Sequence, residues 1–320
     1  MSKSLSETRI GRRLRFRDLQ VFFAVAECGG MAKAAAQLGV TQPAVSDIIA
    51  GIESAFGVRL FDRSPQGVEI TVYGRALLKR GLAAFDELKQ GIRDIEFIAD
   101  PIVGEVRIGC VESISGTLLS PFAQQFCLEY PRIALRVDQV VTPTLELPDL
   151  HARKLDLVLA RLSMPHAQDP FGDDVNVEVL FDDQPVVATG ANSKWARRRK
   201  IDLSELVDAP WVATPRETVT TAALEQAFQA RKLPIPRIRI TTFSLQLRMH
   251  LLARGNFLTA MPRSLLRLDA GGIRLKALPV ELPIRSFPVA IVTLKNRTLS
   301  PVVQLFLERL RTFSRENGFT

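Results

Sequence analysis

Cysteine and histidine are scarce in this sequence. Its 320 residues include three of each, and Cys28, Cys110 and Cys127 do not have the spacing of metal ligands. The sequence therefore predicts no metal site. We expect the cysteines to be small, buried hydrophobic residues in a reducing cytoplasm, with a redox-sensing role for one thiol as the alternative.

Catalytic motifs are absent as well. His151, His166 and His250 are scattered and accompany no nucleophile motif, and the sequence has no G-x-S-x-G, no P-loop and no H-E-x-x-H. We predict that the chain is not an enzyme and uses no cofactor. Two alternatives stay open: an enzyme with a DNA-binding appendage, which substrate turnover would reveal, and an architectural DNA-binding protein without an effector.

Long apolar segments are also missing. The start, MSKSLSETRIGRRLRF, has basic residues without the apolar segment of a signal peptide, and no uncharged apolar run approaches the length of a membrane span. The sequence contains neither a clear internal repeat nor a low-complexity tract. These features favour a cytoplasmic protein that has no membrane partner.

Positive charge is concentrated at the N-terminal end. The whole chain has a formal net charge of +8, and residues 1–80 hold 12 Lys and Arg against 7 Asp and Glu, a net charge of +5. The hydrophobic content of 47% suffices for two or three domains with sizeable cores. A basic N-terminal part indicates a polyanionic partner such as DNA.

The stretch GGMAKAAAQLGVTQPAVSDIIAGIE, from Gly29 to Glu53, has the pattern of two helices joined by a tight corner. Small residues at 34–36 permit close helix packing, and Gly39 suits a positive φ after the first helix. Thr41 can cap the second helix, and Pro43 falls in its first turn, where a missing N–H costs little.

The second helix has two distinct faces. One carries an apolar stripe that we expect in the core, formed by Val45, Ile49, Ile52 and Phe56. The other carries the short side chains of Gln42, Ala44, Ser46, Asp47 and Ala50. Because a helix that enters a DNA major groove needs such a face, the stretch predicts a helix-turn-helix, with a plain helical hairpin in a core as the alternative.

Neighbouring segments extend this unit. RFRDLQVFFAVAE predicts an amphipathic helix, and GVRLFDR followed by VEIT predicts a hairpin flanked by Arg59 and Arg63. Thr71 can cap a long helix that runs to about Ala99. Its apolar stripe predicts pairing with a second copy of the chain, with packing on its own C-terminal domain as the alternative; the stripe comprises Leu78, Leu82, Phe85, Leu88, Ile92 and Ile95.

Pro101 and Gly104 mark a boundary, after which strand and helix patterns alternate. EVRIGC, IALRVDQV and LDLVLAR predict strands of a βαβαβ unit, and a second set of strands and helices follows. We infer two α/β lobes. The chain crosses from one lobe to the other twice, near Arg161–Ser163 and near Met261–Ser264. The predicted first lobe covers 104–162 and 264–320, and the second covers 163–263.

Residues 14–100 resemble the winged helix-turn-helix of the LysR-type transcriptional regulators, through FRDLQVFFAVAE, MAKAAAQLGVTQPAVSDIIAGIESAFGVRLFDR and the helix start at Thr71–Gly74. The resemblance implies a winged DNA-binding domain at 14–71, a linker and dimerisation helix at 72–99, and a periplasmic-binding-protein-like effector domain at 104–320. The fold class is then α/β overall. The implied function is sequence-specific transcriptional regulation controlled by a small molecule.

The resemblance also implies roles for single residues. Gln42, Pro43, Ala44 and Ser46 match the part of the recognition helix that faces base edges, and Gln42 suits an adenine. Asp47 departs from the long polar residue common in the family and repels phosphates, so phosphate anchoring is assigned to Arg12, Arg13, Arg59, Arg63 and Arg75. The implied partners are double-stranded DNA, a second copy in a homodimer or homotetramer, and RNA polymerase.

An effector site is expected beyond the carboxyl ends of the strands, where open α/β sheets bind ligands. Hydroxyl and guanidinium groups cluster in the loops there: Ser113, Ser115, Thr142, Thr144, Arg161, Thr214, Arg216 and Thr218. They predict a small organic acid, with ordinary helix capping by the hydroxyls as the alternative. Glu112 in the first loop opposes a dianion.

Overall fold

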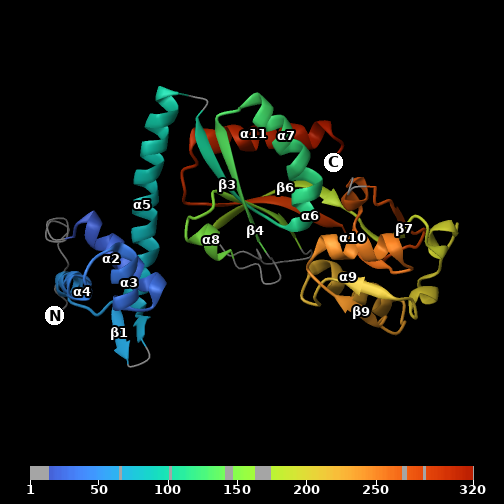
Figure 1. Ribbon diagram of the computed structural model, residues 1–320, viewed down its shortest axis with the longest axis horizontal. Coiled ribbons are helices and arrows are strands. Elements are labelled where there is room, and N and C mark those ends of the chain that lie inside the picture. The colour runs from blue at the N-terminus through green and yellow to red at the C-terminus, as the bar shows by residue number, and fades with distance from the viewer. Residues whose placement is uncertain are drawn as a thin grey trace. The chain divides into compact units, whose positions relative to one another are not determined.

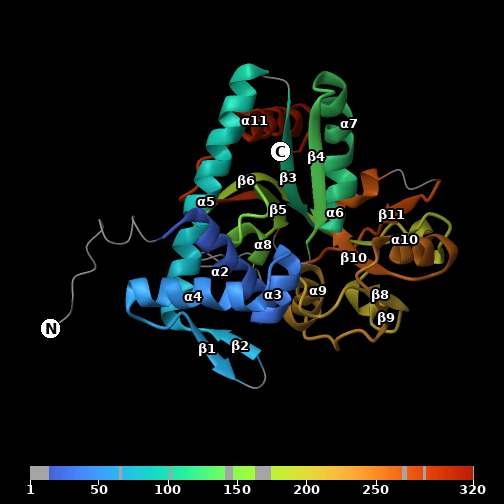
Figure 2. The ribbon, with the colours of Figure 1, turned by 60° about the vertical axis from the view of Figure 1, so that its left-hand side comes forward.

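Among the described residues, three helices and a hairpin form the N-terminal part of the protein (Figure 2). The helices are α2 (Phe16–Cys28), α3 (Met31–Leu38) and α4 (Gln42–Phe56), and the strands are β1 (Phe61–Ser64) and β2 (Gly67–Ile70). Gly29 and Gly39 end the first two helices at φ values of 62° and 66°, which a residue with a Cβ rarely adopts. The predicted helix-turn-helix and wing are both present.

The computed structural model describes residues 14–64, 67–100, 103–140, 147–162, 174–268, 272–283 and 286–319; the side chains of Arg63 and Ser64 are also outside this description. The chain divides into two compact units, residues 1–89 and 90–320. Within the described residues, no helix is both long and apolar enough to cross a membrane.

The core of the first unit lies where the three helices meet. Thr41 caps α4 by accepting a hydrogen bond from the amide of Ala44 at 3.4 Å, as predicted. The fully buried side chains are those of Phe22, Val25, Ala34, Val45 and Ile49. Because Val45 and Ile49 lie on the inner face of α4, the short polar side chains between them face outward.

The wing is attached to α4 by one carboxylate. Glu53 Oε1 accepts hydrogen bonds from the backbone amides of Leu60 at 2.7 Å and Phe61 at 3.2 Å. Thr71 donates to the carbonyl of Arg59 at 2.8 Å and accepts from the amide of Gly74 at 3.0 Å. These bonds hold the hairpin between the recognition helix and the next helix.

The long helix predicted after the wing is α5 (Val72–Ala99), and its apolar positions divide into two groups. Phe85 packs against Phe16 and Phe23 of α2, with ring centroids 5.3 and 5.5 Å apart. Further along, Phe97 packs against the core of the second unit. On the remaining face the apolar side chains are exposed: Leu88 by 50%, Ile92 by 58%, Ile95 by 68% and Ile98 by 80%.

The first lobe of the second unit is built on a five-stranded sheet of order β4-β3-β5-β12-β6. Its strands are β3 (Gly104–Cys110), β4 (Ile133–Gln139), β5 (Leu157–Arg161), β6 (Val175–Asp183) and β12 (Phe287–Leu294). β3 runs parallel to β4 and β5, as the βαβαβ pattern predicts, whereas β12 is antiparallel to both its neighbours.

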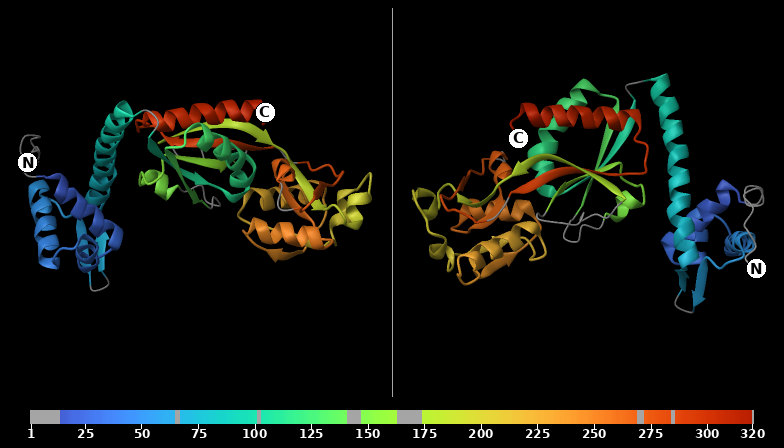
Figure 3. Two further views of the ribbon diagram at one scale, coloured as in Figure 1. Left: turned by 45° about the horizontal axis from the view of Figure 1, so that its top comes forward. Right: turned by 180° about the vertical axis from the view of Figure 1, so that it is seen from behind.

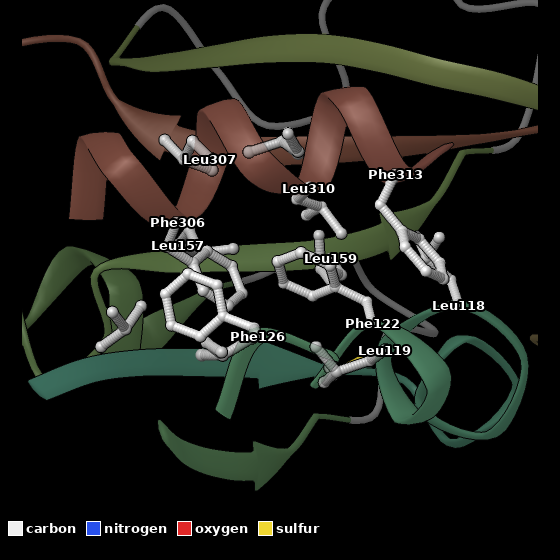
Figure 4. Packing of buried hydrophobic residues seen from close by; sticks show 14 of the residues in the cluster. Leu118, Leu119, Phe122, Phe126, Leu157, Leu159, Phe306, Leu307, Leu310 and Phe313 are labelled. Carbon is white, nitrogen blue, oxygen red and sulfur yellow. The ribbon is translucent and has the colours of Figure 1, made fainter. Parts of the chain in front are cut away.

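Helices cover both faces of this sheet (Figure 3). α7 (Ser120–Glu129) and α11 (Pro301–Glu316) lie on one face, and α8 (Pro148–His151) lies on the other. Phe122 and Phe126 of α7 stack against Phe306 of α11, with centroids 5.1 and 5.4 Å apart (Figure 4). α7 continues a short helix, α6 (Glu112–Ile114), through a π-helical turn at Ser115–Leu119.

A buried carboxylate strengthens this lobe. Asp156 is fully buried and accepts hydrogen bonds from Arg107 Nη2 at 2.7 Å and Arg297 Nη2 at 2.8 Å, and Arg93 Nη1 of α5 lies 3.6 Å away. Burial alone would raise the pKa of Asp156, but the hydrogen bonds and charges of Arg107 and Arg297 outweigh it and hold the pKa below its usual value.

The second lobe has two small sheets, joined by a bridge between Trp211 and Leu258. The strands are β7 (Pro185–Gly190), β8 (Trp211–Ala213), β9 (Ile238–Thr241), β10 (Thr259–Pro262) and β11 (Leu275–Ala277). α9 (Val219–Ala230) packs with Trp211 in one core, and α10 (Leu245–Arg254) packs in another (Figure 1). Three short 3₁₀ helices complete it: Lys194–Arg197, Leu203–Leu206 and Arg263–Arg267.

The lobe boundaries differ from those predicted. β6 pairs with β12 along its length, so residues 175–183 belong to the first lobe, and β11 pairs with β7, so residues 275–277 belong to the second. The crossings therefore follow Asp183 and precede Phe287, not near 161–163 and 261–264. Alternating apolar residues identify a strand, but they do not specify which sheet edge the strand joins.

Candidate functional site

The exposed face of α4 carries the residues predicted to contact DNA bases. Gln42, Pro43 and Asp47 are exposed, while Ala44 and Ser46 are partly buried. They occupy the N-terminal half of the helix, opposite the buried stripe. No large apolar side chain lies among them, so this face has the size and polarity that a major groove admits.

The predicted phosphate anchors lie around this helix and the wing. Arg59 is exposed in the connection from α4 to β1, and Arg75 is exposed in the first turn of α5, where its Nη1 donates to the carbonyl of Ile70 at 2.7 Å. Arg63 lies in β1, but its side chain is outside the described residues, as are Arg12 and Arg13.

A pocket of about 110 Å³ opens where the two lobes of the second unit meet. Its walls come from the loops after β3 and β4, the end of β5, the N-terminal turns of α9 and the start of α10. The lining residues are Val111, Glu112, Ser113, Gln139, Val140, Arg161, Thr214, Thr218, Val219, Thr220, Phe243, Arg248, Pro262 and Leu265. A cavity of roughly 150 Å³ holds benzene, so this smaller pocket admits a short aliphatic molecule as it stands and must widen for an aromatic one.

Arg161, one of the predicted site residues, is 6% exposed, so its guanidinium is a buried charged group in the wall of the pocket. Its Nη1 donates to Asp183 at 2.9 Å, whereas its Nε and Nη2 have no hydrogen-bond partner among the described residues. Burial lowers the pKa of Arg161, although the charge of Asp183 opposes this shift. Nε and Nη2 form the side of a guanidinium that binds a carboxylate with two parallel bonds.

Arg248 of α10 is a second buried arginine in the pocket, and the sequence analysis missed it. It is 6% exposed, its Nε has no partner in the described chain, and burial lowers its pKa against the opposing charge of Glu112. The sequence feature that could have identified Arg248 is its position beside Leu245, Met249 and Leu252 on the apolar face of a helix. An unpaired charge on such a face is costly.

The threonines line the pocket, but their hydroxyl groups are largely engaged. Thr218 donates to the carbonyl of Pro215 at 2.8 Å, Thr221 donates to that of Thr214 at 2.9 Å, and the Thr214 hydroxyl lies 2.5 Å from that of Thr218. These bonds shape the loop before α9, although Thr218 makes no side-chain cap hydrogen bond to the helix, so they are not the helix capping given as the alternative. Because these bonds fix the loop, helix α9 begins at the wall of the pocket.

Besides Arg161, three of the eight predicted effector residues lie in the pocket: Ser113, Thr214 and Thr218. Ser115 does not line it, because its hydroxyl donates back to the carbonyl of Val111 within the helix. Arg216 does not either, because it points to Glu225, with an ion pair of 2.8 Å. Thr142 and Thr144 lie outside the described residues.

The three thiols have different environments. Cys110 is fully buried, and burial raises its pKa to about 12, which keeps it as an unreactive thiol. Cys28 is partly buried and Cys127 is exposed, so the expectation of burial is confirmed only for Cys110. Among the described residues, no group of three or more His, Cys, Asp or Glu could hold a metal ion.

Comparisons with known proteins match both parts of the chain. The family model for the LysR substrate binding domain matches residues 99–315, and that for the bacterial regulatory helix-turn-helix protein, lysR family, matches residues 16–75. The transcriptional regulator GbpR of Azospirillum brasilense is 26% identical over 302 residues, which cover 94% of this chain and 87% of that protein.

Two solved structures show the same fold. A full-length variant of OxyR from Pseudomonas aeruginosa has a TM-score of 0.66 and 20% identity, covering 93% of this chain and 95% of that one. Full-length CbnR in complex with its target DNA has a TM-score of 0.53 and 20% identity, covering 94% and 100%. The order of a winged helix-turn-helix, a long helix and a two-lobed domain is common to them.

Proposed function

The chain belongs to the LysR family of DNA-binding transcriptional regulators, and from that premise we propose that a small organic acid, bound between the lobes, controls its binding to DNA. The observation that carries this proposal is that Arg161 lines the pocket while its buried Nε and Nη2 have no hydrogen-bond partner among the described residues. Buried N–H groups without partners are costly, and a carboxylate ligand that reached them would satisfy both at once.

The DNA-binding half of the proposal rests on α4. Its exposed residues suit base contacts, so we assign Gln42 to an adenine and the exposed Arg59 and Arg75 to phosphates. CbnR, which shares the fold, has been solved with its target DNA. We assign Arg63, and Arg12 and Arg13, to phosphate anchoring on their sequence positions alone.

We further propose a homodimer or homotetramer that contacts RNA polymerase and acts in the cytoplasm, where a bacterial regulator meets its DNA. The exposed apolar stripe of α5 supports pairing of two copies. A two-fold dimer imposes two-fold symmetry on its site, so the operator is an interrupted palindrome with half-sites about one helical turn apart or a multiple of it.

In vitro selection from random-sequence DNA tests the DNA-binding half. The wild-type protein should enrich an interrupted palindrome. Gln42→Ala should weaken the binding free energy for this palindrome by about 1–3 kcal/mol and should lose the base preference at one position. Arg59→Ala should instead weaken binding to all sequences and reduce the slope of its salt dependence by about one. Enrichment of a single asymmetric half-site would contradict the dimer.

A thermal-shift screen of small carboxylic acids tests the effector half. A ligand of the folded state raises the melting temperature through mass action. Arg161→Lys should lose most of this shift, because a lysine keeps a positive charge beside Asp183 but cannot bind a carboxylate with two parallel hydrogen bonds. Arg216→Ala, an exposed arginine that is paired with Glu225, is the matched control and should keep the shift. If no small acid stabilises the wild type, or if Arg161→Lys responds as fully as the control, the pocket does not bind an acid.

A further inference from the structure

One carboxylate of the protein itself already occupies part of the pocket. Glu112, the first residue of α6 in the first lobe, accepts a hydrogen bond through Oε2 from the backbone amide of Leu245 at 2.9 Å. Leu245 is the first residue of α10 in the second lobe, so the bond joins residues 133 positions apart. The N-terminus of a ten-residue helix is a favourable place for a negative charge.

Arg248 belongs to the same helix and lies one turn after Leu245. Glu112 and Arg248 both line the pocket, and the charge of Glu112 opposes the effect of burial on the pKa of Arg248. Glu112 therefore supplies the counter-charge for one of the two buried arginines. A ligand that placed its own carboxylate beside Arg248 would meet Glu112 at close range, and like charges in such a site repel strongly.

Arg161 is in a different situation. Its counter-charge is Asp183, which accepts a hydrogen bond from Nη1 of Arg161. Asp183 also accepts hydrogen bonds from the backbone amide of Ser264 at 3.0 Å and from the Ser264 hydroxyl. Asp183 thus leaves Nε and Nη2 of Arg161 unpaired in the described chain. The first anion position of the pocket is at Arg161, whose Nε and Nη2 are buried beneath the pocket surface, so a ligand reaches them only after the surrounding side chains move. The second is between Arg248 and Leu245, where Glu112 lies.

We propose that Glu112 is a built-in carboxylate that fills the second anion position, so that the pocket binds monocarboxylates at Arg161 and rejects dicarboxylates. This specificity rests on the proposed effector function of the pocket. Glu112 is the residue that sets it, and its bond to Leu245 ties the two lobes together when the pocket is filled by a monoanion.

Titration calorimetry with matched acids on the full chain tests the proposal. The probes are butyrate with succinate and benzoate with phthalate, two pairs that differ by one carboxylate. The wild type should prefer each monocarboxylate. Glu112→Gln keeps an oxygen acceptor for Leu245 and removes the charge, so its affinity for the dicarboxylates should rise at least about tenfold relative to the monocarboxylates.

Glu217→Gln is the control, because Glu217 is exposed next to Thr218 but does not line the pocket; it should leave the preference unchanged. A second variant, Glu112→Ala, vacates the anion position, so acetate should raise its melting temperature more than that of the wild type at equal ionic strength. An unchanged preference in Glu112→Gln, an equal change in Glu217→Gln, or no acetate effect in Glu112→Ala overturns the proposal. If none of the four proteins binds any acid, the effector function on which the proposal rests is overturned instead.

Discussion

Arg161 and Arg248 are both buried in the pocket, but only the first was predictable from its sequence position. Arg161 ends a buried strand, and the carboxyl ends of strands line the ligand crevice of α/β sheets. Arg248 lies within a helix, away from any loop, so the rule that assigns ligand residues to loops missed it. An arginine on the apolar face of a helix indicates a binding site as well as a polar residue in a loop does.

Ser115 and Arg216 show the opposite error. Both are near the pocket along the chain, but the direction of each side chain was decided by a nearby partner: a helix carbonyl for Ser115 and Glu225 for Arg216. Loop position predicts which backbone reaches a site, but it does not predict which of several polar side chains points into it. That choice depends on tertiary contacts.

The Asp156 cluster gives a prediction for stability and pH. Asp156→Asn should cost about 3–5 kcal/mol in the free energy of unfolding at neutral pH, because Arg107 and Arg297 lose their buried counter-charge. The pKa of Asp156 is lowered in the folded state, so its contribution is present above the unfolded value of about 3.9 and is lost as the pH falls through the folded pKa.

Urea unfolding of both proteins at neutral pH and in a series below pH 4 measures this difference. The gap between wild type and Asp156→Asn should narrow as the pH falls, while Asp208→Asn, an exposed aspartate in the second lobe, should show no gap at any pH. A gap that stays constant into acid would show that the carboxylate contributes no charge interaction.

Gly74 gives a second prediction at this scale. A Cβ at this position would collide with the carbonyl oxygen of Leu60 and with Ile70, so Gly74→Ala should destabilise the winged unit by about 1–3 kcal/mol. The matched control is Gly51→Ala in α4, where a Cβ meets nothing within 4 Å; it should stabilise by about 0.5–1 kcal/mol. Thermal melts of the two variants should move in opposite directions, and parallel shifts would contradict the packing seen around Gly74.

At the scale of elements, the helices and strands follow from local pattern. The caps at Thr41 and Thr71, the turns at Gly29 and Gly39 and the apolar spacing of α4 are all visible in the sequence. The partners of β6 and β11 are not, because the pairing of an edge strand depends on distant parts of the chain. That is why the lobe boundaries differ from the prediction.

The apolar side chains of α5 have different environments. Phe85 and Phe97 pack within their own units, whereas Leu88, Ile92 and Ile95 are exposed. The predicted effect of charging Phe85 is therefore a loss of packing against α2. The positions available to a second copy are those further along the exposed face.

Ile92→Glu and Ile95→Glu should convert a dimer to monomers, because each places an unpaired charge in an apolar seam between two helices. Multi-angle light scattering measures the mass directly. Lys89→Glu, at an exposed position about a quarter turn away from the stripe, is the control and should stay dimeric. If all three variants have the mass of the wild type, α5 does not hold the copies together.

At the scale of the whole molecule, the proposed control couples the binding of an acid in the pocket to the binding of DNA by another part of the chain. A ligand shifts a conformational equilibrium only by its differential affinity for the two states. Residues from both lobes line the pocket, and Glu112 already bonds across it to Leu245, so lobe closure is a state that an acid can favour. We propose that, in an oligomer, such closure changes the spacing of the DNA-binding units on the operator.

DNase I footprinting on the selected palindrome, with and without the acid that stabilises the protein best, tests this central claim most directly. We predict that the acid changes the extent of the wild-type footprint, while Arg161→Lys gives the same footprint with and without it and binds DNA as tightly as the wild type in its absence. A wild-type footprint that the acid leaves unchanged, or a change that Arg161→Lys shares in full, would contradict control of DNA binding through this pocket.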